Sequence, residues 1–216
     1  MSNTENNKIP SAGESETKIQ TVRIANVRAL VVTAIMCAVG IILQNLEFAI
    51  PIIPSFIKLD FSELPALITT FAYGPLWGIL VCFVKNLIHL FFGSSMGIGE
   101  ISNFILGAVF VGVAGIIYKK IKSLKGALIA CIIGSTAMAI FSVFSNYFVI
   151  YPLYVKVLGM PMEAIIGMYS GILPAADNLW KALIIFNVPF TFTKGLIDSV
   201  FCFIIYKRIS PILKKR

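Results

Sequence analysis

Residues 126–151 read GALIACIIGSTAMAIFSVFSNYFVIY and contain no charged side chain. At about 1.5 Å per residue, a helix of this length covers about 39 Å, whereas the hydrocarbon core of a membrane is about 30 Å thick. The stretch also lacks the separate apolar and polar faces of a helix on the surface of a soluble protein. It therefore predicts a membrane-spanning helix, which we expect to end at Pro152 because proline cannot continue the hydrogen-bonding pattern.

Further apolar stretches lie on both sides of this one. The chain of 216 residues is 58% hydrophobic and only 13% charged, about half the charged fraction of a typical soluble domain. One long stretch is divided by Tyr73-Gly74-Pro75, whose turn chemistry predicts two short helices. The predicted spans are 28–50, 61–74, 76–92, 100–118, 126–151 and 183–206. We therefore expect an all-α, polytopic membrane protein with six transmembrane helices.

The positive charges predict the orientation of these spans. Thirteen of the 18 Lys and Arg residues lie in 8–28, 119–125 or 207–216. Basic segments beside apolar spans stay in the cytoplasm, and six spans place all three on one side. A seventh span at 162–173 would move the basic tail outside, and a stretch of that length covers only about 18 Å. We expect a short surface helix there and both termini in the cytoplasm.

The domain organisation follows from the same pattern. Residues 1–22 are polar and rich in Ser, Glu, Asn and Lys, a composition that predicts a disordered cytoplasmic leader. Residues 23–216 form a single six-helix membrane domain, to which we assign substrate binding on the grounds that follow.

Polar residues of the spans gather near the predicted outer ends. They are Gln44, Asn45, Glu47, Asp60, Glu63, Lys85, Asn86, His89, Glu100, Asn103, Asn146, Tyr147 and Asn187, with Thr191, Lys194 and Asp198 lying deeper. The cytoplasmic halves hold almost only Ala, Val, Ile, Leu, Phe and Gly. A channel needs polar side chains along its full length, whereas a pocket open to the outside needs them at one end. The distribution favours a pocket.

Several of these residues also have a purely structural interpretation. Lys194 and Asp198 lie four positions apart and could neutralise one another on one helix face. Lys85, Asn86 and His89 could seal helix contacts or reach toward the outer interface. Both interpretations stand beside the functional one.

The amides are harder to explain by packing alone. Asn146 and Asn187 lie in apolar surroundings, where an amide requires hydrogen-bonding partners. An asparagine side chain offers one acceptor and two donors, which suits the edge of a heterocycle that carries carbonyl and N–H groups. The 17 Phe, seven Tyr and two Trp residues could supply apolar walls for a flat ring.

Other function classes lack their motifs here. The sequence has no GxxxxGK[ST] loop for nucleotides, no HExxH and no CxxC pair. No aromatic residues interleave the basic clusters as a nucleic-acid platform requires. We expect no metal, no cofactor and no nucleic acid, and any import must depend on a partner. The alternative from another class is a small intramembrane enzyme that uses Lys85, His89 and Asp198.

Four stretches resemble the riboflavin-specific substrate-binding (S) component of energy-coupling factor (ECF) transporters. They are PIIPSFIKLDFSELPALITTFAYGPLWGILVCFVKNLIH (51–89), GEISNF (99–104), Asn146-Tyr147 with Tyr151-Pro152, and PFTFTKG (189–195). The resemblance covers residues 28–208. The first stretch is typical of the riboflavin branch, and the last is shared more widely among vitamin-binding S components.

The resemblance implies a six-helix bundle in the bacterial plasma membrane that binds riboflavin, and FMN as a further ligand, from outside. It implies assembly with a membrane coupling protein and two cytoplasmic ATPases, and no enzymatic activity. The substrate-binding residues are then Asn86, Glu100, Asn103, Asn146, Tyr147, Asn187, Thr191 and Lys194. Phe56, Lys58 and Asp60 belong to a gating loop, and Ala34 and Ala38 form a small-residue face that docks the coupling protein.

One position departs from the family pattern. Thr191 stands where the family commonly has Asn, and Asn187, one helical turn earlier, is the alternative amide. An S component for thiamine, biotin or pantothenate is the alternative within the same class.

Overall fold

The structure, a computed structural model, describes residues 12–93 and 95–214. Its helices are α1 (Ala12–Asn45), α2 (Glu63–Tyr73), α3 (Pro75–His89), α4 (Ile98–Lys120), α5 (Leu124–Ser145), α6 (Tyr151–Leu158), α7 (Met162–Ser170), α8 (Leu179–Ala182) and α9 (Val188–Lys214). Two π-helical turns, η1 (Asn146–Ile150) and η2 (Leu183–Asn187), join α5 to α6 and α8 to α9. The described chain is mostly helical, as the sequence predicts.

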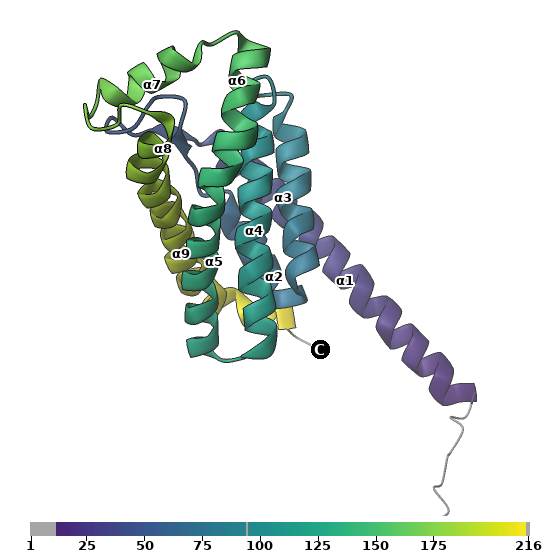
Figure 1. The fold of residues 1–216 in the computed structure, drawn as a ribbon. Coiled ribbons are helices and arrows are strands. Elements are labelled where there is room, and N and C mark those ends of the chain that lie inside the picture. Colours follow the sequence, from purple (N-terminus) through teal and green to yellow (C-terminus); the bar gives the residue numbers. More distant parts are fainter. Residues whose placement is uncertain (1–11, 94, 215–216) are drawn as a thin grey trace, which may run out of the picture.

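The first helix begins earlier than expected. Residues 1–11 of the predicted disordered leader lie outside the described residues, but 12–22 belong to α1. No proline follows Pro10 until Pro51, so nothing in the backbone chemistry stops the helix from extending upstream. Figure 1 shows the N-terminal part of α1 leaning away from the bundle, while its C-terminal part packs against α2 and α3.

The other long helices form the bundle. Its core joins residues of α2, α3, α4, α5 and α9, with Leu67, Val81 and Phe110 fully buried. Small residues allow close contact between the helices. A Cβ atom added at Gly134 of α5 would lie 3.0 Å from the backbone oxygen of Phe110 in α4. A side chain at this position would therefore crowd the backbone of α4, and glycine allows the two helices to pack closely.

Pro152 does not end the fifth helix, which corrects the sequence prediction. The helical segment runs on from Leu124 to Leu158. The π-helical turn η1 ends at Ile150, two residues before the proline, and its altered hydrogen-bonding pattern accommodates a residue without a backbone N–H. Pro189 follows η2 in the same way. Both distorted turns carry an asparagine, Asn146 in the first and Asn187 in the second.

A second apolar cluster closes the end of the bundle opposite the α4–α5 turn, the end that the sequence predicts to be the outer one. It is built from α6, α7, α8 and η2, with Tyr151, Ile165, Tyr169 and Leu183 buried within it. Met162–Ser170 is a short helix, as the length argument predicts. The loop between α1 and α2 lies beside it and contains a two-residue antiparallel pair, β1 (Phe48–Ala49) and β2 (Lys58–Leu59), which the sequence did not indicate.

Four described helical segments are long and apolar enough to cross a membrane. They are Asn26–Asn45, Ile98–Lys120, Leu124–Leu158 and Leu179–Ile205. Of the other two predicted spans, α3 is apolar but has 15 residues and α2 has 11, too few to cover a core of about 30 Å by themselves. The α4–α5 turn, the C-terminal end of α9 and the N-terminal end of α1 lie at the same end of the bundle in Figure 1.

Candidate functional site

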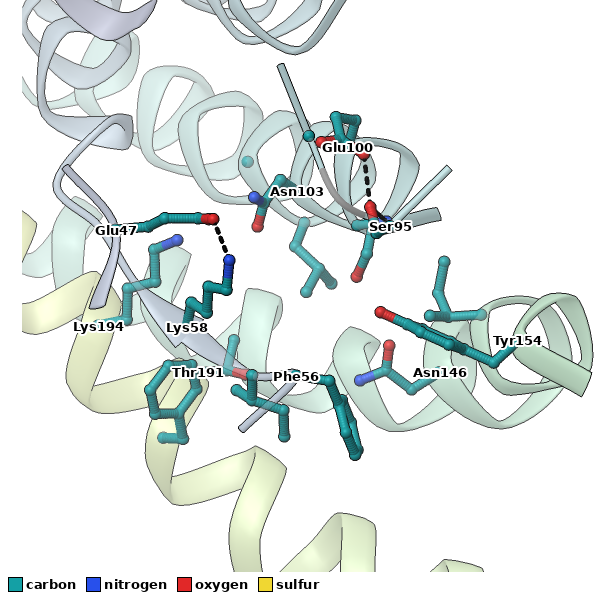
Figure 2. A pocket seen from close by; sticks show the side chains of 18 of the residues that line it. Glu47, Phe56, Lys58, Ser95, Glu100, Asn103, Asn146, Tyr154, Thr191 and Lys194 are labelled. Atoms are coloured by element: carbon teal, nitrogen blue, oxygen red, sulfur yellow. Dashed lines mark hydrogen bonds and ion pairs between the residues drawn. The ribbon is translucent and has the colours of Figure 1, made fainter. Parts of the chain in front are cut away.

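A cavity of about 320 Å³ lies where the bundle core meets the outer apolar cluster. This volume falls at the lower end of the range for small-molecule sites. Its walls come from the α1–α2 loop, the ends of α3 and α4, α5, η1, α6 and α9. Figure 2 shows side chains from these separate elements pointing into one space. We refer to this cavity as the chamber.

The chamber presents polar groups on several sides and apolar groups between them. Its polar lining includes Glu47, Lys58, Glu63, His89, Ser95, Glu100, Ser102, Asn103, Asn146, Thr191 and Lys194. Its apolar and aromatic lining includes Phe56, Ile57, Leu106, Met138, Ile150, Tyr151, Tyr154, Leu158, Met160 and Phe190. A mainly apolar wall with a few convergent polar groups is typical of a small-molecule site.

A buried ion pair forms one edge of the chamber. The ammonium of Lys194 on α9 donates to Oδ2 of Asp60 at 2.8 Å, and Asp60 is 1% exposed. Asp60 also accepts hydrogen bonds from the backbone N–H and the hydroxyl of Ser62 at the start of α2. Burial alone would raise the pKa of the Asp60 carboxyl, but the Lys194 ammonium and the more distant Lys85 outweigh it and hold this pKa well below its usual range.

A second buried pair lies next to the first. Lys85 on α3 donates to Glu63 Oε1 on α2 at 2.9 Å and also to the Ser62 hydroxyl, and Lys85 is fully buried. The Cys82 thiol contacts the other Glu63 oxygen at 3.2 Å. Ser62 therefore connects the two ion pairs into one network, which we call the buried charge network.

Asp198 is not the partner of Lys194, which corrects the pairing that the spacing suggested. Asp198 is fully buried, and no described residue donates a hydrogen bond to either of its carboxyl oxygens. The two residues are neighbours on one helix face, but the ammonium of Lys194 is directed to Asp60 on another element, at 2.8 Å. A basic residue N-terminal to an acidic one is also the weaker order for such a pair.

Three polar contacts stabilise the rim of the chamber. Lys58 of β2 pairs with Glu47 across the α1–α2 loop (Figure 2). Glu100 at the start of α4 accepts from the Ser95 hydroxyl at 2.8 Å, and its other oxygen lies 2.8 Å from Nδ1 of His89. The contact between His89 and Glu100 joins the end of α3 to the start of α4.

Aromatic packing holds the α1–α2 loop over the chamber. The Phe56 ring lies 6.1 Å from Tyr151, 5.8 Å from Tyr154 and 6.0 Å from Tyr169, measured between ring centroids. Two of these contacts are edge-to-face, the preferred arrangement for aromatic pairs. Ile57, the next residue of the loop, also packs against this cluster.

Most of the predicted site residues come together in the chamber. Glu100, Asn103, Asn146, Thr191 and Lys194 line it, as do Phe56 and Lys58 of the predicted gating loop. Figure 2 shows Asn103 and Asn146 projecting toward the same space from opposite sides. Ala34 and Ala38, predicted to dock a partner, are exposed on α1.

Four predicted residues lie outside the lining because each has another partner. Asn86 accepts from Gln44 Nε2 at 2.9 Å and donates to the Cys82 carbonyl at 2.8 Å. Tyr147 stacks on Trp180 with ring centroids 4.3 Å apart. Asp60, predicted to belong to the gating loop, bonds to Lys194 and Ser62.

Asn187 is the fourth of these residues. It accepts from the Tyr169 hydroxyl at 2.9 Å and donates to the Tyr151 hydroxyl at 3.4 Å. Its amide is therefore occupied within the outer cluster, and Asn187 does not replace the family Asn at the position of Thr191.

The sequence did not single out some of the lining residues as ligand contacts. His89 appeared only as a packing residue or a catalytic alternative, although it lies one helical turn after Lys85 and Asn86 on the same span. Tyr154, Met160 and Phe190 had no polar signal that could mark them, because aromatic and apolar residues are common throughout this chain.

The chamber suits an uncharged or weakly charged ligand better than a metal. Its lysines, Lys58 and Lys194, are both paired with carboxylates. The described residues contain no group of three or more His, Cys, Asp or Glu side chains placed to hold a metal ion. Amide, hydroxyl and aromatic groups therefore provide most of what a ligand would contact.

The proposed catalytic alternative does not assemble. Lys85 is paired with Glu63 and His89 with Glu100. Asp198 contacts neither of them through a hydrogen bond.

A family model described as the substrate-specific component of ECF transporters matches residues 28–206. The chain belongs to this family. Its members are components of transporters and not enzymes, so the interpretation of Lys85, His89 and Asp198 as an enzymatic group is set aside.

Individual relatives agree with this assignment. The chain is 33% identical over 192 residues to the riboflavin transporter RibU of Staphylococcus aureus (strain TCH60), a match that covers 87% of this chain and 93% of that protein. It is 30% identical over 194 residues to the riboflavin transporter FmnP of Bacillus subtilis (strain 168), covering 88% and 96%. A solved structure of the S component of a bacterial ECF transporter is 32% identical, with a TM-score of 0.70 over 88% of this chain and 99% of that one.

The Lys194–Asp60 pair leads to a stability prediction. Lys194→Met leaves the Asp60 carboxylate buried without its cation, and we expect a cost of about 3–5 kcal/mol. Because the folded pKa of Asp60 is lowered, the pair contributes fully above the unfolded pKa of about 3.9 and is lost only as the pH falls below it. Thermal unfolding of the ligand-free protein should thus show the same deficit at about pH 6 and about pH 8.

Two further variants control this measurement. Lys181→Met removes the exposed pair with Asp177 and should cost less than about 1 kcal/mol. Adding Asp60→Asn to Lys194→Met removes the uncompensated charge and should recover part of the loss. Equal melting temperatures for Lys194→Met and the parent would contradict the pairing.

Proposed function

We propose that this chain is the riboflavin-binding S component of an ECF importer, which captures the vitamin outside and relies on other subunits for energy. The observation that carries the proposal is the chamber, which opens among amide, hydroxyl and aromatic groups at one end of an apolar bundle. The relatives RibU and FmnP are named riboflavin transporters and match most of the chain.

The chemistry of the lining fits the two halves of this ligand. A flavin ring has flat apolar faces and an edge of carbonyl and N–H groups. Tyr154 and Phe190 offer aromatic surface, and the Asn146 amide offers a donor and an acceptor for the ring edge. The ribityl chain carries hydroxyls, for which Glu100 and Asn103 across the chamber are suitable partners.

Lys194 provides a hydrogen-bond donor for the ligand. One of its N–H groups is directed to Asp60, which anchors the ammonium, and the remaining N–H groups are free to face the chamber that Lys194 lines. Thr191, at the family's Asn position, offers a hydroxyl in place of an amide.

The α1–α2 loop serves as the gate. Phe56 and Lys58 line the chamber and hold the loop by side-chain contacts alone, a ring cluster and a rim ion pair. Such contacts can be broken without unfolding a helix. Asp60 lies at the base of the loop, where Lys194 and Ser62 bond to it while the loop covers the chamber.

Energy for transport comes from partner subunits, a membrane coupling protein and two cytoplasmic ATPases. Ala34 and Ala38 lie on an exposed face of α1, where small side chains allow another helix to approach closely. This face is the proposed contact with the coupling protein.

In the membrane we assign six spans, with the short helices α2 and α3 crossing as a tilted pair. Both termini and the lysine-rich α4–α5 turn then lie in the cytoplasm of a bacterium, and the α6–α8 region lies outside. The common position of these three basic segments at one end of the bundle supports this orientation.

The first test concerns the ligand. Asn146→Ala should weaken riboflavin binding about ten- to a hundred-fold, because a ligand polar group loses its partner at a cost of about 1–3 kcal/mol. Quenching of flavin fluorescence by the purified protein measures this. Asn45→Ala removes an exposed amide bonded to its own helix and should bind like the parent. Undiminished binding by Asn146→Ala would contradict the placement of the ring edge.

A second test concerns coupling. Ala38→Leu should abolish uptake by whole cells while riboflavin binding to the purified variant stays intact, because the bulky side chain blocks helix approach. Ala164→Leu, at an exposed alanine of α7, is the matched control and should transport normally. Loss of binding in a folded Ala38→Leu protein would refute a role limited to docking.

A third test concerns topology. Cysteine introduced at Glu163, which is exposed on α7, should react with a membrane-impermeant reagent on intact cells. Cysteine at the exposed Ser123, in the α4–α5 turn, should react only after lysis. The reverse pattern would invert the assigned orientation.

The alternative is an S component for thiamine, biotin or pantothenate. The same fluorescence assay separates the two, since an excess of the true ligand displaces riboflavin and the others do not.

A further inference from the structure

Asp198 is a buried carboxyl that the proposed transport function does not use. It lies on α9 with no exposed surface, one turn beyond Lys194, and no donor from the described residues reaches either oxygen. It does not line the chamber. An ionised carboxylate in such a place would be both desolvated and unpaired.

The buried charge network around it is already balanced. Lys194 is paired with Asp60, and Lys85 with Glu63. An ionised Asp198 would add a third negative charge to two positive ones within an apolar bundle. An undissociated Asp198 leaves the network neutral.

Among the residues that the structure describes, the charged neighbours of Asp198 offer no other compensation. The charged groups that act on Asp198 are Lys194 on its own helix, Asp60 before α2, Glu63 on α2 and Lys85 on α3. The thiol of Cys202 on α9 also lies near Asp198, and it lies near the thiol of Cys131 on α5. Each lysine among these groups is already paired with a carboxylate.

We propose that Asp198 is a proton-binding site, which holds a proton while Lys194 is paired with Asp60 and releases it when Lys194 turns to Asp198. In the release step the O–H bond of Asp198 breaks, the proton passes to a base of the aqueous phase, and the new carboxylate pairs with the Lys194 ammonium. No electrons are transferred. Lys194 thus has two alternative partners, one at the chamber and one a turn deeper.

This site has a consequence for the gate. Asp60 marks the base of the α1–α2 loop, so any displacement of the loop that separates Asp60 from Lys194 leaves a buried ammonium without its anion. Asp198, on the same helix as Lys194, can take the place of Asp60 as the paired anion once it has released its proton. Loop movement and proton release are then linked events.

Infrared spectroscopy of the full-length protein in detergent tests the proposal without any ligand, so failure of riboflavin binding would not affect the result. The chain has only three aspartates, Asp60, Asp177 and Asp198. Aspartate labelled with ¹³C at the side-chain carboxyl therefore shifts the bands of these three groups alone. We expect the parent at neutral pH to show a label-sensitive carbonyl band of an undissociated acid, which disappears as the pH is raised.

The variants assign the band. Asp198→Asn should remove it, and Asp177→Asn, at an exposed position, should retain it. Asp60→Asn should also remove it, because Lys194 then turns to Asp198 and ionises it. A parent spectrum without the band, or a band that survives Asp198→Asn, would overturn the proton site. A band that persists in Asp60→Asn would overturn the exchange of partners.

Should Asp198→Asn fail to fold, Asp198→Glu keeps an acid at this position but removes its label, so the label-sensitive shift of the band should disappear; a shift that persists in Asp198→Glu would overturn the proton site.

Discussion

The arrangement of the chamber depends on the ion pair between Lys194 and Asp60, which joins residues 134 positions apart in the chain. A buried charge that loses its partner is far more costly than one at the surface, so this contact fixes the start of α2 against the middle of α9. Ser62 extends the constraint to Lys85 and Glu63, and hence to α3. Three helices are thereby held in register beneath the chamber.

Two kinds of contact surround the chamber, and they differ in how readily they yield. Beneath it lie buried ion pairs and close helix contacts, such as that between Gly134 and Phe110. Above it, the α1–α2 loop is held through the Phe56 ring and the Lys58–Glu47 pair near the surface. In the gating role that we propose for the α1–α2 loop, this division lets the loop open while the helix contacts beneath the chamber keep their shape.

The prolines show how a distortion of a helix can position a side chain at a binding site. Pro152 and Pro189 interrupt the hydrogen bonding of two long helices, and each is preceded by a π-helical turn that carries an asparagine. The first turn directs Asn146 into the chamber, whereas the second leaves Asn187 bonded to Tyr151 and Tyr169. Equivalent backbone features thus have different outcomes, decided by the neighbouring side chains.

The sequence by itself determined that the chain is a helical membrane protein, because uninterrupted apolar stretches have few other stable conformations in water or lipid. It also placed the polar residues at one end, and the family motifs identified the class of transporter. Only the tertiary structure decided which of these residues meet. Lys194 has an acidic residue one turn away in sequence, yet it pairs with Asp60, which the fold brings to the ammonium from a position 134 residues earlier in the chain. The sequence predicted Asn86 and Asn187 as ligand contacts. In the structure, Gln44 bonds to the first amide and two tyrosines bond to the second. Local sequence does not show which helices become neighbours, so it could not reveal these partners.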